Sequence, residues 1–310
     1  MVRIDKILSD FISDCNLRGM SKDSIRSYKS TLSIFFEFLK EKGVSTDKVD
    51  REVLKDFINY LRVDRGIGPK TMENYFASMS SFYKYLMFEE KINYNPILPV
   101  RERYVRQYKK GNGNNHNGKK VLTLDQMSSL INSIMDSRDR AVVTLLSKTG
   151  IRRVELLSLD ISDINWENYS ITLKPTPKRS NRLLFFDDET ARQIKSYLRI
   201  REQTYTKGTK ALFVGERGER LSGNTIYRIV TKYAVRLGYH DPSSDKTEDH
   251  LSPHCLRHFF TTEMRRAGMP REFIQELRGD IRKGAIDIYD HIDSKELRES
   301  YLACVPQFGI

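Results

Sequence analysis

The residues best suited to chemistry lie in one short stretch, His254-Cys-Leu-Arg-His258, directly after Ser252-Pro253. A serine followed by proline is typical of a helix start, because the hydroxyl can cap the first turn and proline fits the first helical position. His254, Arg257 and His258 then face the same side of the helix. The positive end of the helix dipole and its unpaired N–H groups lie beside them. The stretch predicts a phosphate site; the alternative is a core helix with a hydrogen-bonded histidine.

Several stretches together resemble the conserved boxes of a known family. They are TGIRRVELLSL at 149–159, SPHCLRH at 252–258, LRGD at 277–280 and DIYDH at 287–291. Their order and spacing are similar to those of the tyrosine recombinases, also called the phage integrase family, with the Xer recombinases of bacteria and archaea as the nearest branch. The resemblance extends loosely over the whole chain. It implies an enzyme that cuts and rejoins DNA strands.

The resemblance also implies which residues are catalytic. Tyr289, in an Ile-Tyr-x-His-Ile context, matches the family's nucleophile; Tyr301 is a nearby rival without that context. Arg152 and Arg257 would grip the non-bridging phosphate oxygens, because a guanidinium matches phosphate bidentately. His254 would act in general acid–base catalysis.

Neighbouring residues would support these groups. Glu155, one helical turn from Arg152, could orient that arginine, although a surface ion pair is the alternative. Arg153 would serve DNA or solvent, and His258 is expected to support the site without reacting. The family's lysine, a general acid for the 5′-hydroxyl, lies in the turn between the second and third strands. Lys178 matches it best, and Lys174 stays open.

One position departs from the family pattern. The residue after Gly279 is usually histidine or tryptophan in the family, and here it is Asp280. A carboxylate beside a scissile phosphate is repulsive unless it is protonated or paired. We expect Asp280 to turn away and cap the local turn, so that Arg282 or Lys283 supplies the charge. The alternative is a weakened site.

Composition limits the class of protein. The chain has 310 residues and a net charge of +12, which favours a polyanionic partner such as nucleic acid or an acidic membrane surface. Three widely spaced cysteines without a CxxC pair predict reduced thiols rather than disulfides or a zinc site. No apolar run is long enough to cross a bilayer, and the N-terminus lacks a signal-peptide pattern. We expect a cytoplasmic protein without a metal, another cofactor or a membrane partner.

Hydrophobic periodicity predicts a mostly α-helical chain. Short runs enriched in Ile, Tyr, Leu and Phe predict a small antiparallel sheet. Residues 1–100 form four amphipathic segments with short connections, a helical bundle that by resemblance is the SAM-like core-binding domain. Residues 121–310 would form the catalytic domain. Its strands are expected at 162–165, 169–174 and 181–186. Its helices are expected at 123–135, 139–148, 188–201, 223–237, 253–267, 270–277 and 294–303.

Residues 101–120 carry seven basic residues against one acid, half of the net charge. The stretch GNGNNHNG at 111–118 has no apolar side chain to bury, so we expect a flexible basic linker that lies across DNA. The linker residues expected to contact phosphates are Lys109, Lys110, Lys119 and Lys120. On the bundle they are Lys22, Arg26 and Lys70, with an ordinary solvated face as the alternative.

These features predict a site-specific recombinase that forms a 3′-phosphotyrosyl bond on double-stranded DNA and releases a 5′-hydroxyl. By resemblance, four protomers on two DNA sites pass through a Holliday junction, and segment 294–303 docks on a neighbouring protomer. The alternatives are a catalytically weakened DNA-binding protein of this fold and a type IB topoisomerase-like enzyme that relaxes supercoils. A metal-dependent nuclease is disfavoured because no clustered acidic motif stands out.

Overall fold

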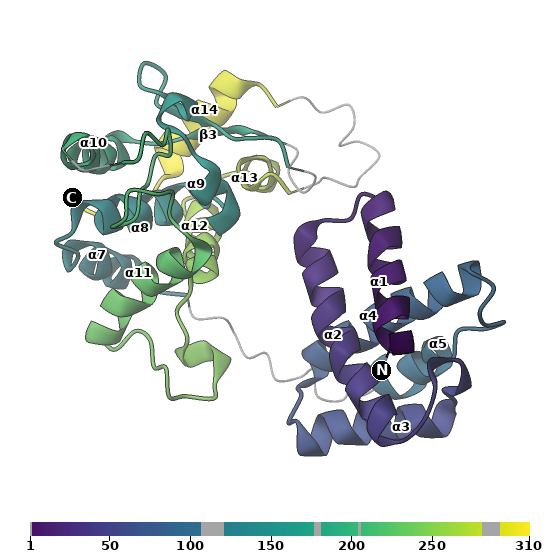
Figure 1. Cartoon of the computed structure of the whole chain (residues 1–310). Helices are drawn as coiled ribbons and strands as arrows, with labels where there is room; N and C mark the ends of the chain where they lie inside the picture. The colour runs from purple at the N-terminus through teal and green to yellow at the C-terminus, as the bar shows by residue number, and fades with distance from the viewer. Residues whose placement is uncertain (1, 107–120, 177–180, 204–205, 281–291) are drawn as a thin grey trace. The chain divides into compact units, whose positions relative to one another are not determined.

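The computed structural model describes residues 2–106, 121–176, 181–203, 206–280 and 292–310. The chain divides into two compact units, Met1–His116 and Asn117–Ile310, which are drawn in Figure 1. Each unit has a hydrophobic core of its own. The described residues are mostly helical and contain a three-stranded antiparallel sheet in the second unit. The predicted fold class is confirmed.

The first unit is built on four main helices, α1 (Val2–Leu17), α2 (Lys22–Glu41), α3 (Arg51–Asn59) and α4 (Pro69–Phe88). Ser21 and Asp50 cap α2 and α3 through their side-chain oxygens, and Pro69 opens α4. Short turns η1 (Thr46–Lys48) and η2 (Tyr60–Asp64) connect or extend them. Their apolar faces meet in a core rich in aromatic rings, among them Phe11, Phe35, Phe57, Phe76 and Phe82. The bundle therefore forms as the periodicity predicted.

The first unit extends beyond the expected boundary at residue 100. Helix α5 (Ile97–Val100) runs directly into a further helical turn, η3 (Arg101–Val105). Val105 is fully buried, and the Arg101 guanidinium lies 2.5 Å from a Glu73 carboxylate oxygen. The expectation of a flexible linker over 101–120 is therefore wrong for residues 101–105. Val100 and Val105 bury apolar surface that the high local density of charge concealed in the sequence. Residues 107–120 of the predicted linker lie outside the described residues.

The second unit is organised around α8 (Ser137–Thr149), whose residues from Ala141 to Thr149 are all buried. Around it lie the helices α7 (Leu124–Asn132), α9 (Arg153–Ser158), α10 (Asp188–Glu202), α11 (Gly223–Arg236), α12 (Pro253–Arg266), α13 (Arg271–Arg278) and α14 (Ser294–Cys304). The short turns are η4 (Ile161–Asp163) and η5 (Thr247–Asp249). Helix α8 packs directly against α10 and α12. Figure 1 shows this central position.

The sheet has the order β1 (Ile164–Asn165), β2 (Ser170–Thr172), β3 (Leu183–Phe185), and all its neighbours are antiparallel. Ile171 of β2 lies opposite Ile164 on one side and Leu184 on the other. All three are buried, which joins the sheet to the main core. The three strands fall inside the predicted ranges.

Gly150 ends α8 and directs the chain toward the first motif. Its backbone is left-handed (φ 60°), as expected for a helix C-cap. A Cβ atom at this position would clash with the Phe260 ring of α12. Gly150 therefore permits both the turn and the close packing of α8 on α12, and this packing sets the position of Arg152.

Helix α14 packs on its own unit. Leu297 and Tyr301 are 3% and 1% exposed, and the Tyr301 hydroxyl donates to the Lys148 carbonyl at 3.1 Å. Burial raises the pKa of Tyr301 well above that of an ordinary tyrosine. Tyr301 is thus a packing residue in this structure, which removes it as a rival nucleophile.

A buried ionic cluster holds the residues that follow α14. The fully buried Lys148 ammonium bridges the carboxylates of Asp187 and Glu189. Glu189 also accepts the backbone N–H groups of Phe308, Gly309 and Ile310. Burial acts to raise the pKa of both carboxyls, but Lys148 and the N–H donors outweigh it and hold both pKa values below the usual range.

Lys148→Met is expected to destabilise the protein by about 3–5 kcal/mol at neutral pH, because it leaves two buried carboxylates without their cation. In the wild type the lowered pKa values contribute stability that is present at neutral pH and lost as pH falls through them. In the variant, protonation relieves the uncompensated charge, so the difference should shrink on acidification. Urea denaturation at pH 7 and pH 5 measures this, with the exposed Lys210→Met as control. A difference that stays constant or grows at low pH would contradict it.

Candidate active site

The two predicted arginines meet although they come from distant parts of the chain. Arg152 is the N-cap residue of α9, and Arg257 lies in the second turn of α12. Both donate to the Arg278 carbonyl at the end of α13, Arg152 Nη1 at 3.1 Å and Arg257 Nη2 at 2.8 Å. Three helices therefore bring two guanidiniums to one point.

Glu155 holds Arg152 in position through two hydrogen bonds. It is 3% exposed, and its two oxygens accept from the Arg152 backbone N–H at 2.8 Å and from Nη1 at 3.0 Å. The pair is therefore not a surface salt bridge, and Glu155 has the orienting contact proposed from its spacing. Arg153 points elsewhere, with Nη1 3.4 Å from the Gly223 carbonyl.

Arg257 is buried and held by backbone carbonyls. It is 4% exposed, and its Nη1 donates to the carbonyl of Gly150. Burial first, and then the neighbouring Arg152 and Arg278, lower the pKa of Arg257 to about 10. Arg257 remains cationic at neutral pH, and its charge is poorly solvated. A poorly solvated cation interacts more strongly with an anion than an exposed one does.

Asp280 does not turn away from the site, which contradicts our expectation from the sequence. Its Oδ1 lies 3.0 Å from Arg152 Nη2 and 3.1 Å from Arg257 Nη2, and its Oδ2 lies 3.0 Å from Arg278 Nε. The Asp280 backbone N–H donates to the Gln275 carbonyl, and Gly279 adopts the left-handed conformation that ends α13. The turn therefore uses the backbone for capping and leaves the carboxylate directed at the arginines. Arg282 and Lys283 lie outside the described residues.

His254 lies in the first turn of α12 and is exposed. Ser252 and Pro253 occupy the predicted N-cap and first positions, although the Ser252 hydroxyl contacts the Cys255 sulfur (3.3 Å) instead of capping a backbone N–H. The ring centroid of His258, the second histidine of the motif, lies 4.6 Å from that of His254. On the opposite face Leu256, Phe260 and Met264 are fully buried, as predicted.

A pocket of about 390 Å³ opens over these groups. Its lining includes Arg152, His254 and Arg257, together with Tyr227 from α11. Neither Tyr227 nor Arg278 was identified as a site residue from the sequence. Arg278 lies within the LRGD stretch, where its place beside Gly279 was a usable signal. Tyr227 has no such signal, because only the packing of α11 brings it to the pocket.

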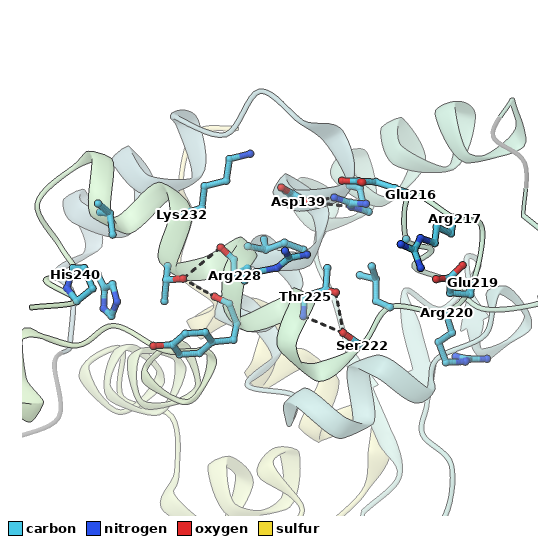
Figure 2. Close-up of a pocket in the computed structure, with 18 residues that line it drawn as sticks. Asp139, Glu216, Arg217, Glu219, Arg220, Ser222, Thr225, Arg228, Lys232 and His240 are labelled. Atoms are coloured by element: carbon cyan, nitrogen blue, oxygen red, sulfur yellow. Dashed lines mark hydrogen bonds and ion pairs between the residues drawn. The ribbon is translucent and has the colours of Figure 1, made fainter.

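A larger hollow of about 930 Å³ lies along α11 and shares Tyr227 with the first pocket. In Figure 2 its Glu216, Arg217 and Glu219 gather at one end, and Lys232 and His240 lie toward the other. The lining mixes both signs of charge, so it does not form an anion site like the paired arginines.

The structure describes only some of the remaining predicted residues. Lys174 Nζ lies 2.6 Å from Asp160 Oδ2, so its ammonium is engaged in an ion pair. Lys22, Arg26 and Lys70 are exposed on the first unit, and Arg26 pairs with Asp23 at 3.1 Å. Several predicted residues lie outside the described residues, namely Lys109, Lys110, Lys119, Lys120, Lys178 and Tyr289.

Among the residues that the structure describes, no group of three or more His, Cys, Asp or Glu side chains is arranged to hold a metal ion. The described helices likewise include none with the length and apolar character needed to span a membrane.

Comparison with known proteins assigns the chain to a family. Residues 120–296 match the phage integrase family, and residues 7–92 match the phage integrase N-terminal SAM-like domain. The chain therefore belongs to the phage integrase family, the tyrosine recombinases, enzymes that cleave and rejoin DNA strands. The family resemblance of the sequence motifs is confirmed.

Relatives are similar in sequence, and solved structures similar in fold, over nearly the whole chain. Tyrosine recombinase XerC of Thermodesulfovibrio yellowstonii is 28% identical over 95% of this chain and 94% of its own length. Tyrosine recombinase XerD of Staphylococcus epidermidis is 23% identical over 98% of this chain and all of its own. The fold is similar to that of a lambda integrase dimer bound to a COC′ core site (TM-score 0.67, 16% identity, 94% of this chain and 80% of that one). It is also similar to XerH recombinase bound to a palindromic difH substrate (TM-score 0.65, 20% identity, 94% and 83%).

Proposed function

We propose that this protein recombines double-stranded DNA at specific sites, with Tyr289 as nucleophile and a 3′-phosphotyrosyl intermediate. The observation that carries this proposal is the convergence of the Arg152 and Arg257 guanidiniums on a single anionic oxygen, here that of Asp280. Two such forks at one point suit the non-bridging oxygens of a phosphodiester, whose charge grows in the transition state. His254 lies on the same pocket.

The chemistry conserves bond energy. The Tyr289 oxygen forms a bond to phosphorus as the bond to the 5′-oxygen breaks, and the phenol proton passes to a base. Lys178, as the general acid, gives a proton to the leaving 5′-oxygen, and His254 acts in general acid–base catalysis at the same phosphate. A 5′-hydroxyl from a partner strand then attacks the phosphotyrosine and releases Tyr289. One phosphodiester is exchanged for another, so the reaction needs no external energy source.

The assignment of Lys178 is supported by what the structure shows of its rival. The Lys174 ammonium forms an ion pair with Asp160, and the Arg220 guanidinium forms a second ion pair with the same carboxylate. Hydrogen bonds from Lys174 first, and then from Arg220, lower the pKa of the Asp160 carboxyl, so the anion persists as a partner for Lys174. An ammonium engaged in this ion pair is less available to a leaving 5′-oxygen, which favours Lys178 over Lys174.

DNA would be bound by basic residues of both units and of the segment that connects them in sequence. We place this activity in the cytoplasm. Lys22, Arg26 and Lys70 supply exposed charge on the first unit. We propose that they position the duplex through its phosphates and do not read its sequence.

Replacing Lys109, Lys110, Lys119 and Lys120 by glutamine should flatten the salt dependence of DNA binding. Each lost phosphate contact reduces the slope of log K against log salt by about 0.9, because fewer counterions are released. Fluorescence anisotropy at several salt concentrations measures the slope. The same four positions changed to arginine keep the charge and should keep the slope. An unchanged slope in the glutamine variant would show that this segment does not touch DNA.

We further propose that a homotetramer forms on DNA through segment 294–303. In this structure Leu297 and Tyr301 of that segment are seated in their own unit. Docking on a neighbour would therefore exchange an identical element between protomers, at little net change in contacts.

A trapping experiment tests the function. Duplexes bound by the protein are selected from a random pool, and a nick near the cleaved phosphate lets the released fragment diffuse away. A recombinase accumulates a covalent adduct on such substrates and also joins strands between two intact sites. Adduct formation with relaxation of supercoils but no joining would favour the topoisomerase-like alternative. Binding without any adduct would favour the catalytically weakened alternative.

A further inference from the structure

The Asp280 carboxylate lies where a phosphate would be expected. Its Oδ1 is shared by Arg152 Nη2 at 3.0 Å and Arg257 Nη2 at 3.1 Å, and its Oδ2 contacts Arg278 Nε at 3.0 Å. Carboxylate and phosphate oxygens bind a guanidinium with the same geometry. One oxygen between two forks is the contact expected of a non-bridging phosphate oxygen.

The two arginines do not depend on Asp280 for their positions. Arg152 is also bound by Glu155 and the Arg278 carbonyl. Arg257 is also bound by the carbonyls of Gly150 and Arg278. Apart from Asp280, these partners are backbone oxygens and one buried carboxylate. Removal of the Asp280 side chain therefore leaves both forks aimed at the same point.

We propose that Asp280 is an internal substitute for the scissile phosphate, which occupies the anion site of the DNA-free protein and must be displaced when DNA binds. This proposal rests on the proposed function, in which the two arginines grip that phosphate. Two anions in contact with the same pair of forks repel each other even at an effective dielectric of about 20, so they compete for the site.

The Asp280 carboxylate can leave the anion site without a change in the backbone. The Asp280 side chain is 33% exposed, whereas the Arg257 side chain is 5% exposed. The Asp280 backbone is held by its N–H bond to Gln275, so rotation of the side chain alone can bring the carboxylate into water. The cationic cluster is thus neutralised in part while DNA is absent, which weakens the binding of small anions at the site.

The proposal predicts that Asp280→Asn binds inorganic phosphate about tenfold more tightly than the wild type, which corresponds to 1.4 kcal/mol. Isothermal titration with phosphate, at an ionic strength held constant with chloride, measures this without DNA. Asp245→Asn removes an exposed carboxylate from the same unit and should leave the affinity unchanged. Adding Arg152→Ala to Asp280→Asn should abolish the gain, which locates the ion between the forks.

The direction of the change separates this proposal from an orienting role. A carboxylate that only aligned the arginines would, when lost, leave phosphate binding weaker or unchanged, and either result would overturn the proposal. Asp280→Ser is a second variant should the asparagine variant fold poorly, and melting in chloride checks both. Because the titration uses no DNA, its failure leaves the cleavage chemistry standing. Absence of a covalent adduct alongside the predicted phosphate gain would instead count against the proposed function alone.

Discussion

Tyr289→Phe is expected to abolish the covalent protein–DNA adduct while leaving DNA affinity unchanged. The phenol oxygen is the only atom removed, and without it no bond to phosphorus can form. The measurement is denaturing electrophoresis of the protein with a nicked duplex chosen by selection, beside a binding titration on the same DNA. Since the nucleophile is lost outright, the effect should be complete.

Tyr301→Phe is the matched control for this experiment. Its hydroxyl donates to the Lys148 carbonyl in a buried setting, and its ring packs near Phe185. Loss of that hydrogen bond should cost about 1 kcal/mol of stability and leave adduct formation intact. Persistence of the adduct in Tyr289→Phe, or its loss in Tyr301→Phe alone, would mean that the nucleophile has been misassigned.

Arg257→Lys is expected to slow single-turnover cleavage by about a hundredfold to a thousandfold. This is the usual loss of rate when one preorganised donor to a charged transition state is removed. Lysine keeps the charge but lacks the fork that reaches the Gly150 and Arg278 carbonyls and the anion together. Rapid-quench kinetics at saturating protein measure the rate.

The control for Arg257→Lys lies on the same helix. Arg265 is exposed near the end of α12, so Arg265→Lys should cleave at the wild-type rate. Equal DNA affinity in both variants separates a chemical defect from a binding defect. A rate for Arg257→Lys within tenfold of the wild type would argue that Arg257 does not grip the reacting phosphate.

Much of the fold follows from local signals in the sequence. Ser21, Asp50 and Thr123 cap helices as their residue types predict, since a short polar side chain satisfies a free backbone N–H. Short runs rich in Ile, Tyr, Leu and Phe became β1 to β3. The motif spacing also identified Arg152 and Arg257 as a pair, because the family pattern already encodes which residues meet.

Long-range packing decided the rest. The charge density of 101–120 concealed the helical turn at Arg101–Val105. This turn is stabilised because Val105 is buried in the core of the first unit and Arg101 forms an ion pair with Glu73. Tyr301 stood as a rival nucleophile until the structure showed it buried against α8. Such contacts join residues far apart in the chain, and no local pattern reports them.

At Asp280 the sequence determined the residue type, and the tertiary structure determined the position of its side chain. The sequence by itself determined that a carboxylate replaces the family's usual donor after Gly279, and electrostatic repulsion from a phosphate favoured a side chain that turns away. Only the tertiary structure placed Arg152, Arg257 and Arg278 around that carboxylate. In the absence of DNA the strongest local field is that of three converging cations. The conformation of a charged side chain follows the nearest opposite charge, which is fixed by how α9, α12 and α13 pack.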